Sequence, residues 1–452
     1  MMKNLINNTQ FIEDLSSLIS INSSMDIDTK TKNAPFGIGV RQAFDKFIDI
    51  CNRDGFEVND IDGYALEVNF GTGQEIIGIL GHLDIVEQLD GWDQDPFKLT
   101  IKDNYIYGRG VNDNKGPMLG CYYLFRHLKE TGYIPNKTIR LILGGAEETT
   151  WECIDYYFKH RPQPDLGFSP DGNFPIVNCE RGIAYFSLVG ETELITSSEF
   201  EILSIKTPND TTKVCRSCIV EIKDNKNLIN IIKQGKIISN ENSICCVEYR
   251  GSNTLARNAF KGENAILKMV SDFSNISDCN ISSFIYFLKS YFCDNHYANS
   301  LGLFHKDDLT GTTSSNISRV TFNGDKVSIY FDYRYPSGID YENSLEKLRS
   351  IAITNNLKLT EIDHKAIHYI KSDTKVIQGL SIAYKKVIGQ IPETLSKAAA
   401  SYARATKNCV AFGPTFDGEV SNSHKENENM NIDNFTKALE IYYHAILELD
   451  KQ

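Results

Sequence analysis

The sequence predicts an α/β fold with a mostly parallel sheet flanked by helices, plus an inserted α+β domain. In the first 170 residues, short apolar runs typical of buried strands alternate with stretches whose apolar residues recur at helical spacing. From about residue 184 the runs become shorter and alternate in polarity, as half-buried strands do. At 452 residues the chain also exceeds the usual size of one hydrophobic core, so we expect two domains.

The α/β part begins with two helices, because apolar residues recur every three or four positions over residues 11–19 and 40–51. The second helix is expected to stop near Gly55, since glycine suits the position just after a helix. Runs that are apolar throughout predict strands buried on both faces. The other expected elements are strands over residues 76–80, 139–143 and 166–168, and helices over residues 115–130, 151–160, 376–388 and 435–449.

The middle of the chain, residues 184–370, is expected to form the inserted α+β domain. Residues 327–333 alternate like a half-buried strand, and residues 341–355 have a helical pattern. The flanking parts, residues 1–183 and 371–452, are expected to fold together as the other domain.

The composition excludes several classes of function. The net charge is −12 and no basic stripe is present, so nucleic acid is not an expected partner. No run approaches the roughly 18 apolar residues of a membrane span, so we expect no membrane contact. Residues 1–8 are too polar for a signal peptide, which predicts a cytoplasmic protein. The 11 cysteines are odd in number and scattered, which favours reduced thiols.

Side chains that commonly bind metal ions follow the predicted buried strands, where open α/β sheets place their sites. His82 and Asp84 come directly after the strand over residues 76–80 and point to the same side of an extended segment. His82 is a candidate ligand whose other ring nitrogen Asp84 would hold, or else a histidine that caps the strand. Asp113 stands in a glycine-rich turn before a helix, where it would bridge two metals or cap the helix.

Two more carboxylate positions follow strands. Glu147 and Glu148 come after residues 139–143, and such a pair is either a surface pair or a metal ligand beside a group that handles a proton. Asp171 follows residues 166–168 in an Asp-Gly pair, which by itself is a turn signal. Together these histidine and carboxylate side chains, without thiolates, suit Zn²⁺, Mn²⁺ or Co²⁺.

These motifs, in this order, resemble the di-metal aminoacylase, carboxypeptidase and dipeptidase family. The shared patterns are His82-x-Asp84, Gly108-Arg-Gly-x-x-Asp113, Glu147-Glu148 and Ser169-Pro-Asp171. Flanking stretches are closest to the PepV-like dipeptidases, and the resemblance spans essentially the whole chain. These stretches include Gly91-Trp-Asp-Gln-Asp-Pro-Phe97, Leu301-Gly-Leu-Phe-His-Lys-Asp-Asp-Leu309, Arg334-Tyr-Pro336 and Cys409-Val-Ala-Phe-Gly413.

The resemblance implies a role for each residue. It implies that His82 and Asp171 hold one divalent ion, that Glu148 and His424 hold another, and that Asp113 bridges them and precedes a cis peptide bond. It also implies that Glu147 takes a proton from the attacking water and passes it to the leaving amine. The expected cofactors are two Zn²⁺ or Mn²⁺ ions, with Co²⁺ possible, and the expected substrate is a small peptide.

The inserted domain resembles an enlarged form of the family's lid, which leaves such members monomeric. Arg334 matches the lid arginine that meets the substrate carboxylate. The lid histidine that stabilises the oxyanion is replaced here by Leu255, and no histidine lies between His160 and His296. Arg257 or Asn253 is a candidate replacement, and a lid asparagine also gives way to Ile205.

Three functions therefore stay open. The first is a cytoplasmic metallodipeptidase. The second is an amidohydrolase acting on an N-acyl amino acid or a modified dipeptide. The third is a ligand-binding protein without turnover, a hypothesis that the Leu255 replacement keeps open, because losing one oxyanion donor costs about 10²–10³ in turnover.

Overall fold

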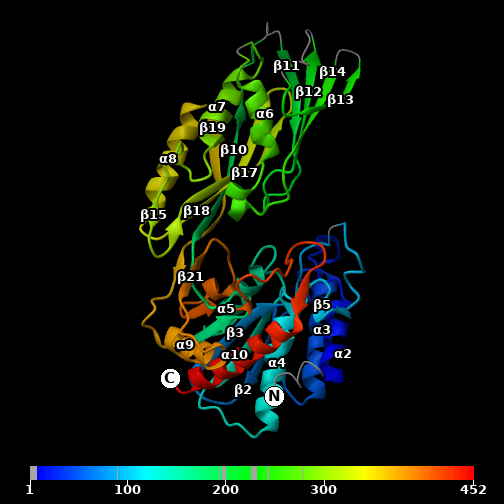
Figure 1. The fold of residues 1–452 in the computed structure, drawn as a ribbon, viewed down its shortest axis with the longest axis vertical. Coiled ribbons are helices and arrows are strands. Elements are labelled where there is room, and N and C mark those ends of the chain that lie inside the picture. The colour runs from blue at the N-terminus through cyan, green and yellow to red at the C-terminus, as the bar shows by residue number, and fades with distance from the viewer. Residues whose placement is uncertain are drawn as a thin grey trace. The chain divides into compact units, whose positions relative to one another are not determined.

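The chain divides into two compact units, which are considered separately (Figure 1). Unit 1 comprises Met1–Cys179, Tyr369–Leu395 and Ala400–Gln452, and unit 2 comprises Glu180–His368 and Ser396–Ala399. The structure is a computed structural model that describes residues 8–88, 90–192, 194–195, 200–224, 232–241, 244–276 and 278–452. Most of the N-terminal segment that argues against a signal peptide, residues 1–7, thus lies outside the described residues.

Unit 1 is built on a mixed sheet with parallel strands at its centre. Strands β6, β3, β7 and β22 pair in parallel, whereas β1 pairs with β2, β2 with β6 and β22 with β9 in antiparallel fashion. The predicted α/β class is confirmed, and antiparallel strands extend the parallel centre at both edges. In spatial order the strands are β1 Val58–Ile61, β2 Ala65–Phe70, β6 Thr138–Gly144, β3 Ile76–His82, β7 Leu166–Ser169, β22 Cys409–Ala411, β9 Ile176–Glu180 and β20 His368–Tyr369, and β21 Thr394–Lys397 also pairs with β9.

The helices of unit 1 pack their apolar residues into one core with the sheet. Helix α4 has the predicted bounds, Lys115–Glu130, and α10 packs against both α4 and α9 (Figure 1). Gly55 follows α3 with a φ of +71°, as a glycine after a helix C-cap does. The other helices are α2 Thr9–Ile19, α3 Ile38–Arg53, α5 Glu152–His160, α9 Lys375–Ile388 and α10 Ile432–Asp450.

A small antiparallel sheet also belongs to unit 1. It pairs β4 with β5 and β5 with β24, and therefore brings residues near 107 beside residues near 429. Its strands are β4 Thr100–Lys102, β5 Tyr105–Tyr107 and β24 Asn429–Asn431.

Unit 2 has an antiparallel sheet with a separate hydrophobic core, so it is an α+β unit. Strand β18 alternates between exposed or half-buried and buried residues from Lys326 to Phe331, but Asp332 and Tyr333 are both buried, so the predicted alternation over residues 327–333 holds only for its first part. The helices of unit 2 are α6 Ala265–Phe273, α7 Ser282–Phe292 and α8 Tyr341–Thr354. In spatial order its strands are β13 Lys236–Glu241, β14 Ile244–Arg250, β12 Ser217–Asp224, β11 Phe200–Lys206, β17 Ser314–Phe322, β18 Lys326–Tyr335, β10 Gly182–Glu191 and β19 Leu357–Lys365.

The parallel centre of the unit 1 sheet brings three strand ends together. Strands β6, β3 and β7 are neighbours that run in the same direction, so their carboxyl ends meet at one edge. His82 is the last residue of β3, Glu147 and Glu148 follow β6, and Asp171 follows β7. Across the part of the chain that the structure describes, no helix has both the length and the apolar character needed to cross a bilayer.

Candidate metal centre

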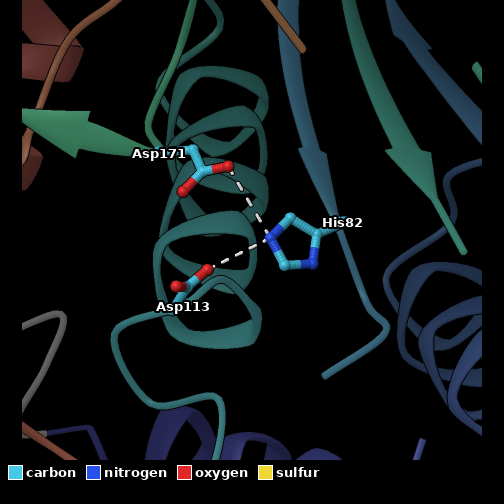
Figure 2. Close-up of side chains that lie close together, drawn as sticks. All are labelled: His82, Asp113 and Asp171. Carbon is cyan, nitrogen blue, oxygen red and sulfur yellow. Dashed lines mark hydrogen bonds and ion pairs between the residues drawn. The ribbon is translucent and has the colours of Figure 1, made fainter. Parts of the chain in front are cut away.

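His82, Asp113 and Asp171 lie close together at the carboxyl edge of the parallel strands. His82 Nε2 is 3.2 Å from Asp113 Oδ1 and 3.7 Å from Asp171 Oδ2 (Figure 2). One ligating atom from each of the three residues lies within 4.8 Å of the other two. We call these three residues the His82 group.

A second cluster shares Asp113 with the first. His424 Nε2 is 3.0 Å from Asp113 Oδ2 and 3.0 Å from Glu148 Oε2. The ligating atoms of Asp113, Glu148 and His424 also lie within 4.8 Å of one another, and we call them the His424 group. Asp113 therefore turns one carboxylate oxygen toward each group, which is the arrangement that a bridging ligand needs.

The carboxylates at this edge are crowded, and bound cations would compensate their charge. Burial raises the pKa of Asp171 to about 8, and the negative charge of Asp113 acts in the same direction. Burial also raises the pKa of Glu148, and its Oε1 is buried without a hydrogen-bond partner among the described residues. Crowded buried carboxylates and an unsatisfied carboxylate oxygen are what bound divalent ions would satisfy. The residues present therefore fit metal ions.

Asp84 positions both the His82 ring and the turn that carries the two glutamates. His82 Nδ1 lies 3.0 Å from the main-chain oxygen of Asp84 and 3.4 Å from its Oδ1. The two carboxylate oxygens accept the backbone N–H groups of Glu147 at 3.1 Å and Glu148 at 3.0 Å. The nearer contact to the ring is thus made by the backbone of Asp84, and the link from its carboxylate to the glutamate turn was not predicted.

Glu147 is half-buried beside these groups. Burial raises the pKa of its carboxyl group well above the usual range, and the charge of Asp171 is the next largest cause. Glu147 therefore sits in surroundings that favour proton uptake by a carboxylate.

Asn114 and Lys115 extend the site in ways that sequence reasoning missed. The Asp113–Asn114 peptide bond is cis, as the resemblance implied, and Asn114 Nδ2 donates to the oxygen of Pro170 at 2.7 Å. Burial lowers the pKa of Lys115 to about 7, and its Nζ donates to the oxygens of Leu18 and Ile21 at 2.9 Å and 2.8 Å. These contacts tie the Asp113 turn to the turn after β7 and to the end of α2.

The predicted substrate-binding residues belong to unit 2, whereas the His82 and His424 groups belong to unit 1. Arg334 on β18 is buried, and its Nε donates to Asp332 Oδ2 at 2.8 Å. Its Nη1 donates to the oxygen of Ala398. Arg257 is an exposed residue on a 3₁₀ turn, Ala256–Lys261, whose N-cap residue is Leu255.

An α/β unit with histidine and carboxylate clusters at the carboxyl ends of its parallel strands fits a metal-dependent hydrolase. Residues 78–448 match the profile of peptidase family M20/M25/M40. This match covers well over half of the chain, so the chain belongs to that family, and the predicted family is confirmed.

Individual relatives agree with this assignment. The Beta-Ala-Xaa dipeptidase of Lactobacillus delbrueckii subsp. lactis is 33% identical over 455 residues, which covers 97% of this chain and 96% of the relative. The solved structure of the Saccharomyces cerevisiae dipeptidase Dug1p superposes with a TM-score of 0.64 at 14% identity, covering 100% of this chain and 98% of that chain. Human carnosine dipeptidase 1 gives the same TM-score of 0.64 at 14% identity, with the same coverage. The two structures support the fold.

The predicted enzyme class is confirmed by the family: the protein is a metallopeptidase, a hydrolase that acts on peptide bonds. Family members use divalent metal ions, and the structure supplies two groups of candidate ligands for them.

Proposed function

We propose that this protein is a dipeptidase that uses two divalent ions. The observation that carries the proposal is that Asp113 faces the His82 group with one oxygen and the His424 group with the other. The full-length relative that acts as a Beta-Ala-Xaa dipeptidase supports the choice of substrate class.

In this proposal the His82 group holds one ion and the His424 group holds the other. Histidine and carboxylate ligands fit Zn²⁺ and Mn²⁺ alike, and Co²⁺ as well. When bound, such ions polarise the scissile carbonyl and make a water molecule acidic enough to attack it near neutral pH.

Glu147 is the proposed general base. Its carboxylate takes one proton from the attacking water and delivers it to the nitrogen of the leaving amine as the amide C–N bond breaks. Water and dipeptide are thereby converted into two amino acids with no other reactant. Asp84 assists because its carboxylate accepts a hydrogen bond from the Glu147 backbone N–H, which orients the turn that carries Glu147.

The proposal gives residues 1–183 and 371–452 the role of the catalytic domain and residues 184–370 that of the lid. Arg334 would bind the substrate carboxylate, because a guanidinium oriented by Asp332 presents donors in a fixed plane. Arg257 would supply the oxyanion donor that Leu255 cannot. The protein is proposed to act as a cytoplasmic monomer.

A second candidate function follows from the Leu255 replacement. The same metal centre would cleave an N-acyl amino acid or a modified dipeptide, or bind such a ligand without turnover. A changed substrate is compatible with an intact metal centre, because the replacement lies in unit 2 and the ligand groups lie in unit 1.

The test is hydrolysis by protein stripped with a chelator and then reloaded with Zn²⁺ or Mn²⁺. Free amine is measured with a panel of dipeptides, including β-alanyl dipeptides, and with a matched panel of N-acyl amino acids. We expect metal-dependent cleavage of dipeptides. Cleavage of the acylated panel alone would favour the second candidate, and tight binding without cleavage would favour a ligand-binding role.

A further inference from the structure

Glu428 is a fully buried carboxylate that none of the proposed chemical steps uses. Its Oε2 accepts hydrogen bonds from Arg109 Nη1 at 2.9 Å and from the backbone N–H of Gly110 at 2.9 Å. Its Oε1 accepts the backbone N–H groups of Asn112 at 2.9 Å and Asp113 at 3.0 Å. All four donors come from the turn that presents Asp113.

Further hydrogen bonds join this turn, residues 108–113, to the segment that contains His424, residues 423–428. The guanidinium of Arg109 also lies 5.1 Å from the ring centre of Trp92. This contact with an aromatic ring adds to its hydrogen bonds with Glu428 and Lys425 and helps to hold it in place. The joining bonds run from Arg109 Nη2 to Lys425 O at 3.0 Å, from Gly108 N to Glu428 O at 3.2 Å and from Asn112 Nδ2 to Ser423 Oγ at 3.1 Å.

The two ligand groups depend on these segments to different degrees. In the His424 group, both Asp113 and His424 lie on segments that Glu428 joins. In the His82 group, His82 and Asp171 are placed by β3 and β7, which pair with each other in the sheet. Within the His82 group, Asp113 is the member whose backbone Glu428 contacts. The next residue, Asn114, joins the same turn to His82 N at 3.4 Å and to the oxygen of Pro170 at 2.7 Å, and these contacts are separate from the four hydrogen bonds of Glu428.

We propose that Glu428 is a positioning residue that keeps Asp113 and His424 in register, so that metal binding by the His424 group depends on it more than binding by the His82 group does. This inference rests on the proposed function, because it takes both groups to be metal sites. A carboxylate is suited to the task, since its two oxygens accept two donors each, and a side chain with a single acceptor oxygen leaves part of the turn unheld.

The experiment compares metal binding by the wild-type protein and by Glu428→Gln. Glutamine keeps the shape but turns an NH₂ group toward two of the four donors. Zn²⁺ is titrated into the chelator-stripped proteins against a chromophoric competitor, which gives the affinity of each ion without any turnover. We expect the first ion to bind nearly as in wild type and the second to bind about 10–100-fold more weakly.

Asp450→Asn is the matched control. Asp450 is also a buried carboxylate, at the end of α10, and it accepts the N–H groups of Asn136 at 3.0 Å and Lys137 at 2.8 Å. It therefore holds a turn in the same manner, but at the amino end of β6, away from the ligand groups. We expect this variant to lower the melting temperature and leave both metal affinities unchanged.

Arg109→Lys keeps the inference testable if Glu428→Gln fails to fold. Lysine retains the positive charge next to Glu428 but lacks the planar fork that also reaches Lys425 O. The second ion should again be weakened selectively, though less.

Wild-type affinity for both ions in the folded variants would overturn the inference, and so would equal weakening of both. These results differ from failure of the proposed function, in which wild-type protein itself would bind no pair of ions.

Discussion

Glu147 and Glu148 are neighbours in the chain but have different surroundings in the structure. Glu148 Oε2 faces His424 at 3.0 Å. The pKa of Glu147 is raised by burial and by the charge of Asp171. Burial raises the pKa of Glu148 as well, so the contact with His424 is what distinguishes the two, and it supports the proposal that Glu148 is a metal ligand and Glu147 the proton acceptor.

The first prediction concerns the proposed base. Glu147→Gln removes the group that accepts the proton and leaves both ligand groups intact, so kcat should fall by about 10²–10⁴ while metal content stays at the wild-type level. Steady-state kinetics and elemental analysis of the same sample provide the check. Glu152→Gln, at an exposed position on α5, should behave as wild type, and retained turnover in Glu147→Gln would refute the assignment.

The second prediction concerns the missing oxyanion donor. If Arg257 replaces the absent histidine, Arg257→Ala should lower kcat by about 10²–10³ with little change in folding, because the residue is exposed. Arg250→Ala, which removes another exposed arginine of unit 2, serves as the control. Equal activity of the two variants would show that Arg257 is not the donor.

At this scale the sequence located part of the site. His82, Glu148 and Asp171 could be found because each follows an apolar run that marks a buried strand. His424 lies in a polar loop with a φ of +62°, so no periodicity marks it and only the family resemblance selected it. Glu428, four residues after His424 in the same loop, was not found, since its partners are the Arg109 guanidinium and backbone N–H groups far away in the chain.

Among the elements, strands and helices with a strong period were predicted well. Helix α4 has the predicted bounds and β3 exceeds its prediction by two residues. The hairpin of β1 and β2 was not predicted, although Asp62-Gly63 is a hairpin signal and both residues have positive φ, +52° and +76°. Its strands are short and carry polar residues, so the apolar pattern alone did not reveal them.

The third prediction concerns the start of α4. A Cβ on Gly116 would lie 2.0 Å from the backbone oxygen of Val111, so Gly116→Ala must displace the turn that carries Asp113. We expect a loss of about 1–3 kcal/mol in the free energy of unfolding, measured by urea denaturation, together with weaker Zn²⁺ binding. Glu130→Ala, exposed at the other end of α4, should change stability by less than about 0.5 kcal/mol, and a Gly116→Ala variant of wild-type stability would contradict the close approach.

At the scale of the whole molecule, the chain leaves unit 1 after Cys179 and returns to it at Tyr369. A short segment, Ser396–Ala399, belongs again to unit 2. The sequence did not predict this second segment of unit 2, because four residues are too few to show a helical or strand pattern of apolar residues. One of them, Ala398, accepts a hydrogen bond from Arg334.

The fourth prediction concerns assembly. The enlarged insertion resembles a lid that takes the place of a partner subunit, so the protein should be a monomer of 51.0 kDa. Light scattering coupled to size-exclusion chromatography, with and without Zn²⁺, measures this mass directly. A mass of roughly twice that value at micromolar concentration would contradict the proposed role of the insertion.

The most direct test of the central claim is the metal content of wild-type protein and of Asp113→Asn after dialysis against trace Zn²⁺. Asp113 contacts both histidines, with Oδ1 3.2 Å from His82 Nε2 and Oδ2 3.0 Å from His424 Nε2. An amide supplies only one acceptor oxygen, so it cannot serve both groups. We predict two ions per wild-type chain, at most one per variant chain, and no dipeptide hydrolysis by the variant. Two firmly held ions in Asp113→Asn, or none in wild type, would contradict a metal centre bridged by this residue.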